Sequence, residues 1–200
     1  MSLARKTQRI ANRLKAELRT GNPGFVCLLV ALMFALGAGS ARAAATASET
    51  EVKAAFIYNF VKFVDWPAEA FTADTAPFRV AVFGDDDVTG RLKVLLSDKK
   101  AHGRSFEVKR VLNPQDAKNS QIVFVTAPES KRTMLVLDAV KKLPILTIGE
   151  SEEFLDLGGM INFVLEDTQL RFEINTESAE KVKLVISSKL LRLAKKRGGK

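Results

Sequence analysis

The sequence predicts an α/β fold: a single domain with a mixed β-sheet, flanking helices, and a C-terminal β-hairpin followed by a long helix. Two almost wholly apolar runs, 78–84 and 121–127, are typical of strands that are buried on both faces. Residues 160–174 alternate between apolar and polar on both sides of a short polar turn, which predicts an antiparallel hairpin. Strands of both kinds, separated by amphipathic helical stretches, indicate a sheet layered between helices.

Residues 1–43 have the composition of a secretory signal peptide. Basic residues dominate the start, a 14-residue uncharged run follows at 25–38, and small residues end the segment. We expect cleavage after Ala43 or Ala45, a short polar lead at 44–50, and one exported domain at 51–200. An uncleaved anchor is the alternative, although the run is shorter than the roughly 20 residues that span a bilayer.

Loss of this segment changes what the charge and the cysteine count imply. It carries seven of the 31 Lys and Arg residues and one of the 23 Asp and Glu residues, which leaves 24 basic and 22 acidic residues. A domain so near neutrality gives no support for nucleic-acid binding. The only cysteine, Cys27, is lost with the segment, so the exported domain has no thiol for a disulfide or a metal site.

The elements of the domain follow from their local patterns. Apolar side chains cover about half of a predicted helix that Thr50 caps and Pro67 ends. Asn175 or Thr176 caps the closing helix, which has acids in its first turn and Lys or Arg in its last. Between these helices we expect a strand at 78–84, a helix after 85–87, strands at 105–112 and 121–127, a helix at 130–143, a strand at 145–149 and the hairpin.

Catalytic constellations are absent from the sequence. His102 lies in a polar turn without a nucleophile or an orienting acid, which favours a solvated loop residue. Asp85, Asp86 and Asp87 follow a buried strand, where capping of the next helix is favoured over a metal-dependent hydrolase site. Gly158 and Gly159 indicate a turn with unusual backbone angles; a small ligand that approaches the bare backbone is the sharper alternative.

A candidate contact surface is found in the first helix. Tyr58, Lys62 and Trp66 are spaced i, i+4, i+8 and therefore share a face opposite the phenylalanine stripe. Two aromatic residues that flank a cation are typical of an interface anchor. The alternative, that this face packs under the closing helix or the hairpin, stays open. In the closing helix, Leu184 and Leu191 lie off the core stripe and could join two copies.

In this order the segments resemble the YfiR family of periplasmic regulatory proteins over roughly residues 51–194. The stretches that carry the resemblance are "KAAFIYNFVKFVDWP", "FRVAVFGDDD", "QIVFVT", "ILTIGESEEFLDLGGMINF" and "LRFEINTESAEKVKLVISSKLLRLA". Family members often have cysteine where this chain has Ala81, and again where it has Ser120 or Gln121. Control by disulfide formation is therefore not expected here.

The resemblance implies a non-enzymatic regulator without a cofactor, located in the periplasm. Such proteins bind the periplasmic domain of a membrane-anchored diguanylate cyclase and keep it inactive, and an outer-membrane lipoprotein can capture them. Cyclic di-GMP, and with it biofilm formation, then depends on this contact. We expect Tyr58, Lys62 and Trp66 to contact the partner, with Arg171 and Glu173 on the outer hairpin face as weaker candidates. The alternatives are a small-ligand sensor near Gly158 and Gly159, or an accessory protein for another membrane receptor.

Overall fold

The computed structural model describes residues 40–84, 86–126 and 132–196, with side chains from Glu49 onward. The predicted signal peptide lies almost wholly outside the described residues, as do Cys27 and Asp85. The chain divides after Ala47 into two units, and the described residues of the first unit are helical. Among the described residues, no helix is both long enough and apolar enough to cross a membrane.

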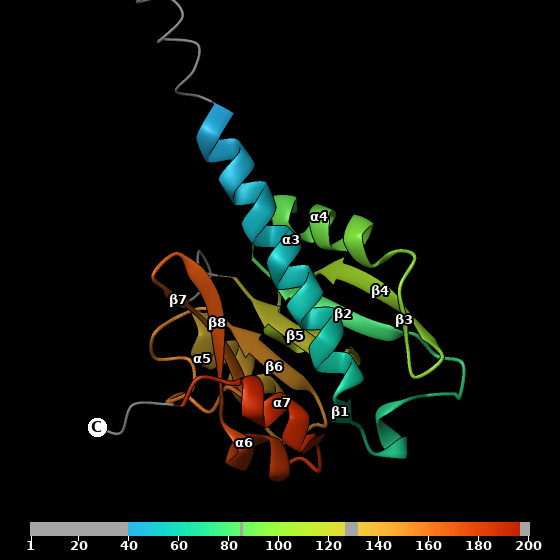
Figure 1. Cartoon of the computed structure of the whole chain (residues 1–200). Coiled ribbons are helices and arrows are strands. Elements are labelled where there is room, and N and C mark those ends of the chain that lie inside the picture. Colours follow the sequence, from blue (N-terminus) through green and yellow to red (C-terminus); the bar gives the residue numbers. More distant parts are fainter. Residues whose placement is uncertain (1–39, 85, 127–131, 197–200) are drawn as a thin grey trace, which may run out of the picture. The chain divides into compact units, whose positions relative to one another are not determined.

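The second unit is built on a seven-stranded sheet with the order β3-β4-β2-β5-β6-β7-β8 (Figure 1). The five central strands are parallel, whereas β3 and β8 are antiparallel to their neighbours. The predicted mixed sheet is therefore confirmed. The strand bounds are β2 Phe78–Phe83, β3 Lys100–Ala101, β4 Arg104–Arg110, β5 Ile122–Val125, β6 Leu146–Gly149, β7 Ile161–Glu166 and β8 Gln169–Ile174.

Helices cover both faces of this sheet, because apolar side chains on each face need cover. On one face, α3 (Ser40–Lys62) and α4 (Asp86–Leu96) share a core with β2, β5 and β7. On the other face, α5 (Thr133–Val140) and the short 3₁₀ helix η2 (Pro114–Asn119) share a second core. The strands β2, β5 and β6 are almost completely buried, as their continuous apolar runs predict.

The first helix differs from its prediction at both ends. It begins at Ser40, so Thr50 lies inside the helix and does not cap it. It ends at Lys62, before Pro67, because the chain turns there into the two-residue strand β1, Val64–Asp65. That strand pairs with β9, Val185–Ile186, and the Ser187 amide donates a hydrogen bond to the Phe63 carbonyl at 2.9 Å.

The hairpin forms as its alternation predicts. Phe163 in β7 lies opposite Phe172 in β8, and both side chains are buried in the core under α3. Asp167 and Thr168 form the two-residue turn, both with positive φ angles of 46° and 71°. Paired positive φ angles match the twist of a tight antiparallel hairpin.

The single long helix expected after the hairpin does not form. Asn175 caps a helix as predicted, but this helix, α6, spans only Thr176–Glu180. Lys183 has a φ of 61°, β9 follows, and a second short helix, α7, spans Ser188–Leu193. The turn at Lys183 places Val182 and Leu184 in the core, and Ile186 of β9 packs against the same core.

This change also removes the predicted dimer face. Leu184 is 1% exposed and belongs to the core, whereas Leu191 is 37% exposed on α7. The two leucines do not share a helix, because α6 ends before Leu184 and α7 begins after it. The prediction that these two leucines join two copies is therefore wrong.

Candidate docking surface

Tyr58 and Lys62 share one face of α3, as their spacing predicts. The Lys62 ammonium lies 5.3 Å from the centre of the Tyr58 ring, a cation–π arrangement. The Tyr58 hydroxyl donates a hydrogen bond to the Lys100 carbonyl at 3.1 Å, and its ring meets Phe106 edge-on at 6.0 Å. The tyrosine is thus half-buried and fixed in place, while Lys62 remains exposed.

Trp66 does not share that face. It follows β1, four residues after the end of α3, so the i, i+8 relation to Tyr58 does not apply. Its ring packs edge-on against Phe78 with centroids 5.1 Å apart, and the indole is half-buried. The indole N–H is buried and has no hydrogen-bond partner among the residues that the structure describes. Trp66 lines a hollow of about 260 Å³ together with Phe71, His102 and Arg104.

His102 has a structural role that the sequence did not reveal. Its exposed ring lies beside the C-terminal end of α3, with Nε2 2.9 Å from the Val61 carbonyl oxygen. The last carbonyls of a helix lack intrahelical partners, so an imidazole N–H at this position satisfies one of them. The expectation of a loop residue surrounded by solvent is therefore only half right.

A solvent-facing apolar strip runs beside α3, and sequence reasoning missed it. Phe56 is half-buried, with its ring centre 5.9 Å from Phe163 and 5.4 Å from Phe172. Leu165 and Leu170 form the next cross-strand pair towards the hairpin turn, on the same face as these two phenylalanines. We call Val52, Phe56, Leu165 and Leu170 the apolar strip.

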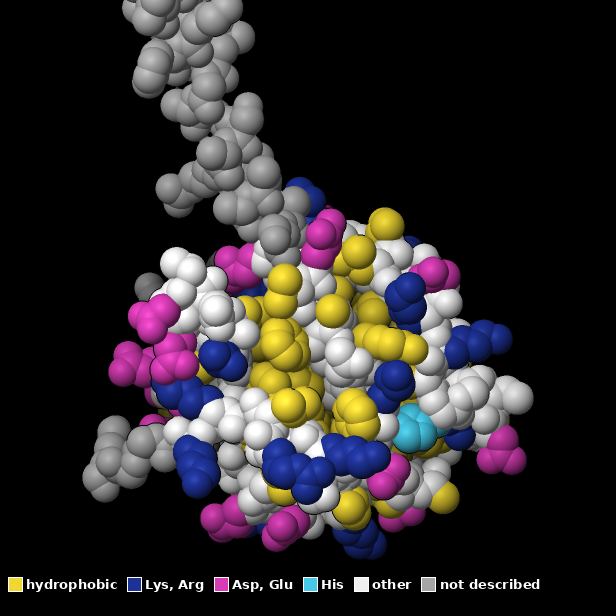
Figure 2. Space-filling model, viewed as in Figure 1, with side chains coloured by type: hydrophobic (Ala, Val, Ile, Leu, Met, Phe, Trp, Pro, Cys, Tyr) yellow, Lys and Arg dark blue, Asp and Glu magenta, His cyan; other side chains and the backbone are white. Residues whose placement is uncertain are grey.

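The apolar strip is exposed to solvent both on the hairpin and on α3. Leu165 is 70% exposed and Val52 is 40% exposed, one turn of α3 before Phe56. Figure 2 shows hydrophobic side chains gathered along α3 on this face of the second unit. The sequence contained a signal for the apolar strip. The apolar stripe of α3 already includes Val52, one turn before the part of the helix that packs on the sheet. Contiguous exposed apolar surface of this kind marks interaction sites.

Arg171 and Glu173 lie on the other face of the hairpin. In β8 they alternate with Phe172, which points into the core under α3. Arg171 donates a hydrogen bond to the Gln169 side chain at 3.1 Å. The structure therefore does not bring these two residues together with Tyr58 and Lys62.

An ion pair stands near them at the hairpin edge. Lys195 lies 2.8 Å from Glu166, and the Lys195 amide donates to the Phe172 carbonyl, so the C-terminal segment follows the edge of β8. The hydrogen bond from Lys195 lowers the pKa of the Glu166 carboxyl, and the same bond raises the pKa of Lys195. Both groups are exposed, so this pair adds little to stability.

Gly158 and Gly159 have different environments. Gly158 is exposed with a φ of 94°, and it lines a cavity of about 350 Å³ with Met134, Thr147 and Met160. Gly159 is buried against the ring of Phe154, whose other side meets Gly149. The space next to the bare backbone of Gly159 is thus filled by an aromatic side chain from the same chain. The unusual backbone angle that the turn interpretation expects is found at Gly158 and not at Gly159.

The aspartates after β2 stand at the start of α4. Asp86 and Asp87 are exposed in its first turn, where acids are favoured by the helix dipole. Asp87 pairs with Arg91 at 2.9 Å, and Asp86 lies 3.8 Å from Arg110. Within the described residues, no group of three or more His, Cys, Asp or Glu side chains could hold a metal ion.

Comparisons with known proteins identify the family. Residues 50–195 match the model of the YfiR/HmsC-like family. Curated protein sequences gave no match. The fold is similar to the crystal structure of a conserved domain protein from Vibrio cholerae O1 biovar El Tor strain N16961, with a TM-score of 0.53 and 12% identity. That similarity covers 72% of this chain and 58% of the Vibrio chain, and at this identity it concerns the fold alone. Since the family model matches well over half of its length, the chain belongs to the YfiR/HmsC-like family.

Proposed function

We propose that this protein is a periplasmic, non-enzymatic regulator that represses a membrane-anchored diguanylate cyclase by direct contact. Membership of the YfiR/HmsC-like family supports a regulatory role. The observation that carries the contact is the apolar strip, which leaves Leu165 largely in solvent next to the aromatic cluster of Phe56, Phe163 and Phe172. Capture by an outer-membrane lipoprotein would relieve the repression.

The two ends of α3 have different tasks in this proposal. The apolar strip supplies the buried centre of the contact, because apolar anchors surrounded by polar groups carry most of the binding energy in protein interfaces. Lys62, exposed above the Tyr58 ring, supplies a charge at the rim. Rim charges mainly steer association and set its salt dependence. Trp66 contributes less directly, because it packs on Phe78 outside the helix.

Leu165→Glu is expected to weaken binding to the periplasmic domain of the cyclase encoded beside this gene by about 30-fold, or about 2 kcal/mol. The side chain is 70% exposed, so the substitution should leave the fold intact. Val94→Glu is the matched control, since Val94 on α4 is 72% exposed and lies outside the apolar strip. Isothermal titration of both variants decides the matter. Equal affinities for the two would remove the apolar strip from the interface.

Lys62→Glu is expected to reduce the association rate several-fold and to change its salt dependence, with a smaller effect on dissociation. The reason is that Lys62 is exposed and its ammonium lies over the Tyr58 ring, without an ion pair in the described part of the chain. Stopped-flow or surface binding measurements at two salt concentrations check this. An association rate that is unchanged at low salt would exclude the C-terminal end of α3 from the contact.

A further inference from the structure

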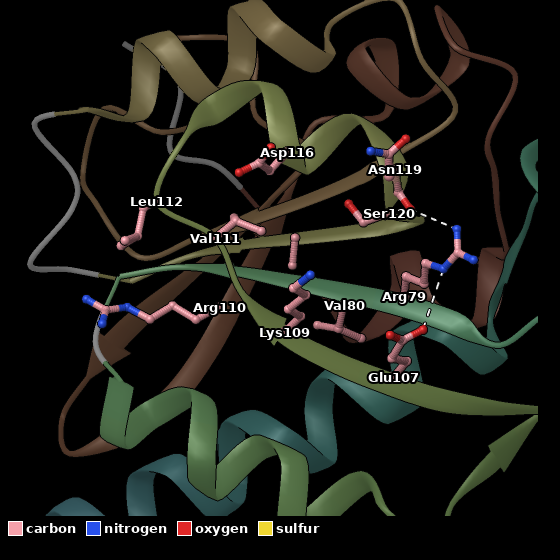
Figure 3. A pocket seen from close by; sticks show the side chains of 11 residues that line it. Arg79, Val80, Glu107, Lys109, Arg110, Val111, Leu112, Asp116, Asn119 and Ser120 are labelled. Carbon is pink, nitrogen blue, oxygen red and sulfur yellow. Dashed lines mark hydrogen bonds and ion pairs between the residues drawn. The ribbon is translucent and has the colours of Figure 1, made fainter.

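The face of the sheet opposite α3 has a cavity that the proposed function does not use. The connection from β4 to β5 contains only the six-residue helix η2, so part of β2 and β4 stays uncovered on this face. The cavity has a volume of about 660 Å³ and lies between these two strands and η2 (Figure 3). Its size falls within the range of small-molecule sites, about 300–1,000 Å³.

Small and apolar residues form the base of this cavity. Ala81 in β2 and Val111 after β4 are buried there, and the Ser120 hydroxyl is buried and donates to the Ala117 carbonyl. Leu112, which is 65% exposed, extends the apolar surface at one end. An apolar portion of a ligand would thus find contacts without displacing any hydrogen bond.

The two arginines at the ends of the cavity already have partners. Arg79 pairs with Glu107 at 3.6 Å, and its guanidinium donates to the Asn119 carbonyl at 3.5 Å. Arg110 donates to the Gly84 carbonyl at 2.8 Å. In Figure 3, Arg79 and Glu107 stand at one end and Arg110 at the other, with Lys109 between them. The arginines mark the two ends of the cavity, but their guanidinium groups already interact with protein groups and are not available to a ligand.

Lys109 and Asp116 are the two other charged residues that line the cavity. Lys109 is paired across the sheet with Ala81, the smallest residue of the base, and Asp116 stands opposite on η2 (Figure 3). Within the described part of the chain, neither the ammonium nor the carboxylate has an ion-pair or side-chain hydrogen-bond partner, and they do not pair with each other. Two opposite charges thus face one cavity from separate walls.

We propose that this cavity binds a small zwitterion, whose carboxylate contacts Lys109 and whose ammonium contacts Asp116. Hydrogen bonds between ionised groups are about twice as strong as neutral ones, and a zwitterion satisfies both charges at once. An aliphatic portion of the ligand lies over Ala81, Val111 and Leu112. The chemical class is that of free amino acids with apolar side chains. This proposal is independent of the docking function of the apolar strip.

Three matched probes test the charge requirement: leucine, its deaminated acid 4-methylpentanoate, and its decarboxylated amine 3-methylbutylamine. Leucine alone is expected to raise the melting temperature of the purified protein, because only it carries both charges, and a ligand that binds only the folded state stabilises it. No shift with leucine, or an equal shift with the acid alone, would overturn the zwitterion site.

Variants test the residues. Lys109→Met and Asp116→Asn are each expected to weaken leucine binding, measured by isothermal titration, by about tenfold or more. Lys118→Met is the control, because Lys118 is exposed on η2 but does not line the cavity. All three positions are exposed, so folding should persist. Equal losses in the control and the two test variants would place the ligand elsewhere.

Discussion

Gly159→Ala is expected to lower the free energy of unfolding by about 3 kcal/mol, the upper end of the range for overpacked cores. A Cβ atom at this position would overlap the ring of Phe154 and would lie 2.7 Å from the Phe154 carbonyl oxygen. The ring cannot move away, because its other side meets the backbone of Gly149, where a Cβ would overlap it as well. Phe154 itself is completely buried. Urea denaturation of the variant measures the loss.

Gly90→Ala supplies the control for this prediction. Gly90 lies in the interior of α4, and a Cβ there would meet nothing within 4 Å. Alanine is therefore expected to stabilise the protein by about 0.5–1 kcal/mol, through helix propensity and the reduced entropy of the unfolded chain. If Gly159→Ala proved as harmless as Gly90→Ala, the ring of Phe154 would not fill this space, and the ligand interpretation of Gly159 would return.

Glu150→Gln is expected to lower the free energy of unfolding by about 2 kcal/mol, since hydrogen bonds to charged groups contribute about 1.5–3 kcal/mol. Glu150 follows β6 and pairs with Lys53 of α3, and both side chains are largely buried, 11% and 14% exposed. Loss of the carboxylate leaves a desolvated ammonium with weaker compensation. Thermal or urea unfolding of the variant checks this.

The same lysine provides the matched control. Glu49 pairs with Lys53 at 2.7 Å along α3, but its side chain is 50% exposed. Glu49→Gln is expected to remove only about 0.3–0.5 kcal/mol, as for other i, i+4 pairs on a helix surface. Similar losses for the two glutamates would show that burial of Glu150 adds nothing to the pair.

The pH dependence of this pair follows from the pKa of Lys53. Burial lowers that pKa, but hydrogen bonds and charge attraction from Glu150 and Glu49 outweigh it, so the pKa lies above its ordinary value of 10.5. A raised pKa in the folded state contributes stability below the unfolded value, and the contribution is lost as the pH rises through the folded value. The difference in stability between wild type and Glu150→Gln should therefore persist across the neutral range and shrink in strong alkali, as the pH rises through the folded pKa of Lys53.

The sheet was predictable from the sequence because its strands carry strong local signals. Buried parallel strands read as continuous apolar runs, and the hairpin alternates on both sides of its turn. The end of α3 and the closing segment were not predictable in this way. Both depend on the pairing of β1 with β9, a contact between residues about 120 positions apart that no local periodicity reports.

The candidate surfaces show the same difference between local patterns, which the sequence reveals, and long-range contacts, which it does not. Spacing was sufficient to place Lys62 over Tyr58, since both lie within one helix. It was not sufficient for Trp66, which leaves the helix, nor for the apolar strip, whose members come from α3 and from a hairpin more than 100 residues later. The environment of Gly159 depends on Phe154, whose ring packs between Gly149 and Gly159. This is a tertiary contact, and no periodic pattern in the sequence predicts it.

The pairing of β1 with β9 has a consequence for how the molecule is made. The first helix shares one hydrophobic core with Val182, Leu184 and Leu190, residues from the final part of the chain. Contacts between residues so far apart slow folding, because the entropy of loop closure is lost before the contact compensates for it. An amino-terminal fragment that emerges first during synthesis or export would lack these core residues. The domain would therefore complete its core only after the C-terminal segment had emerged.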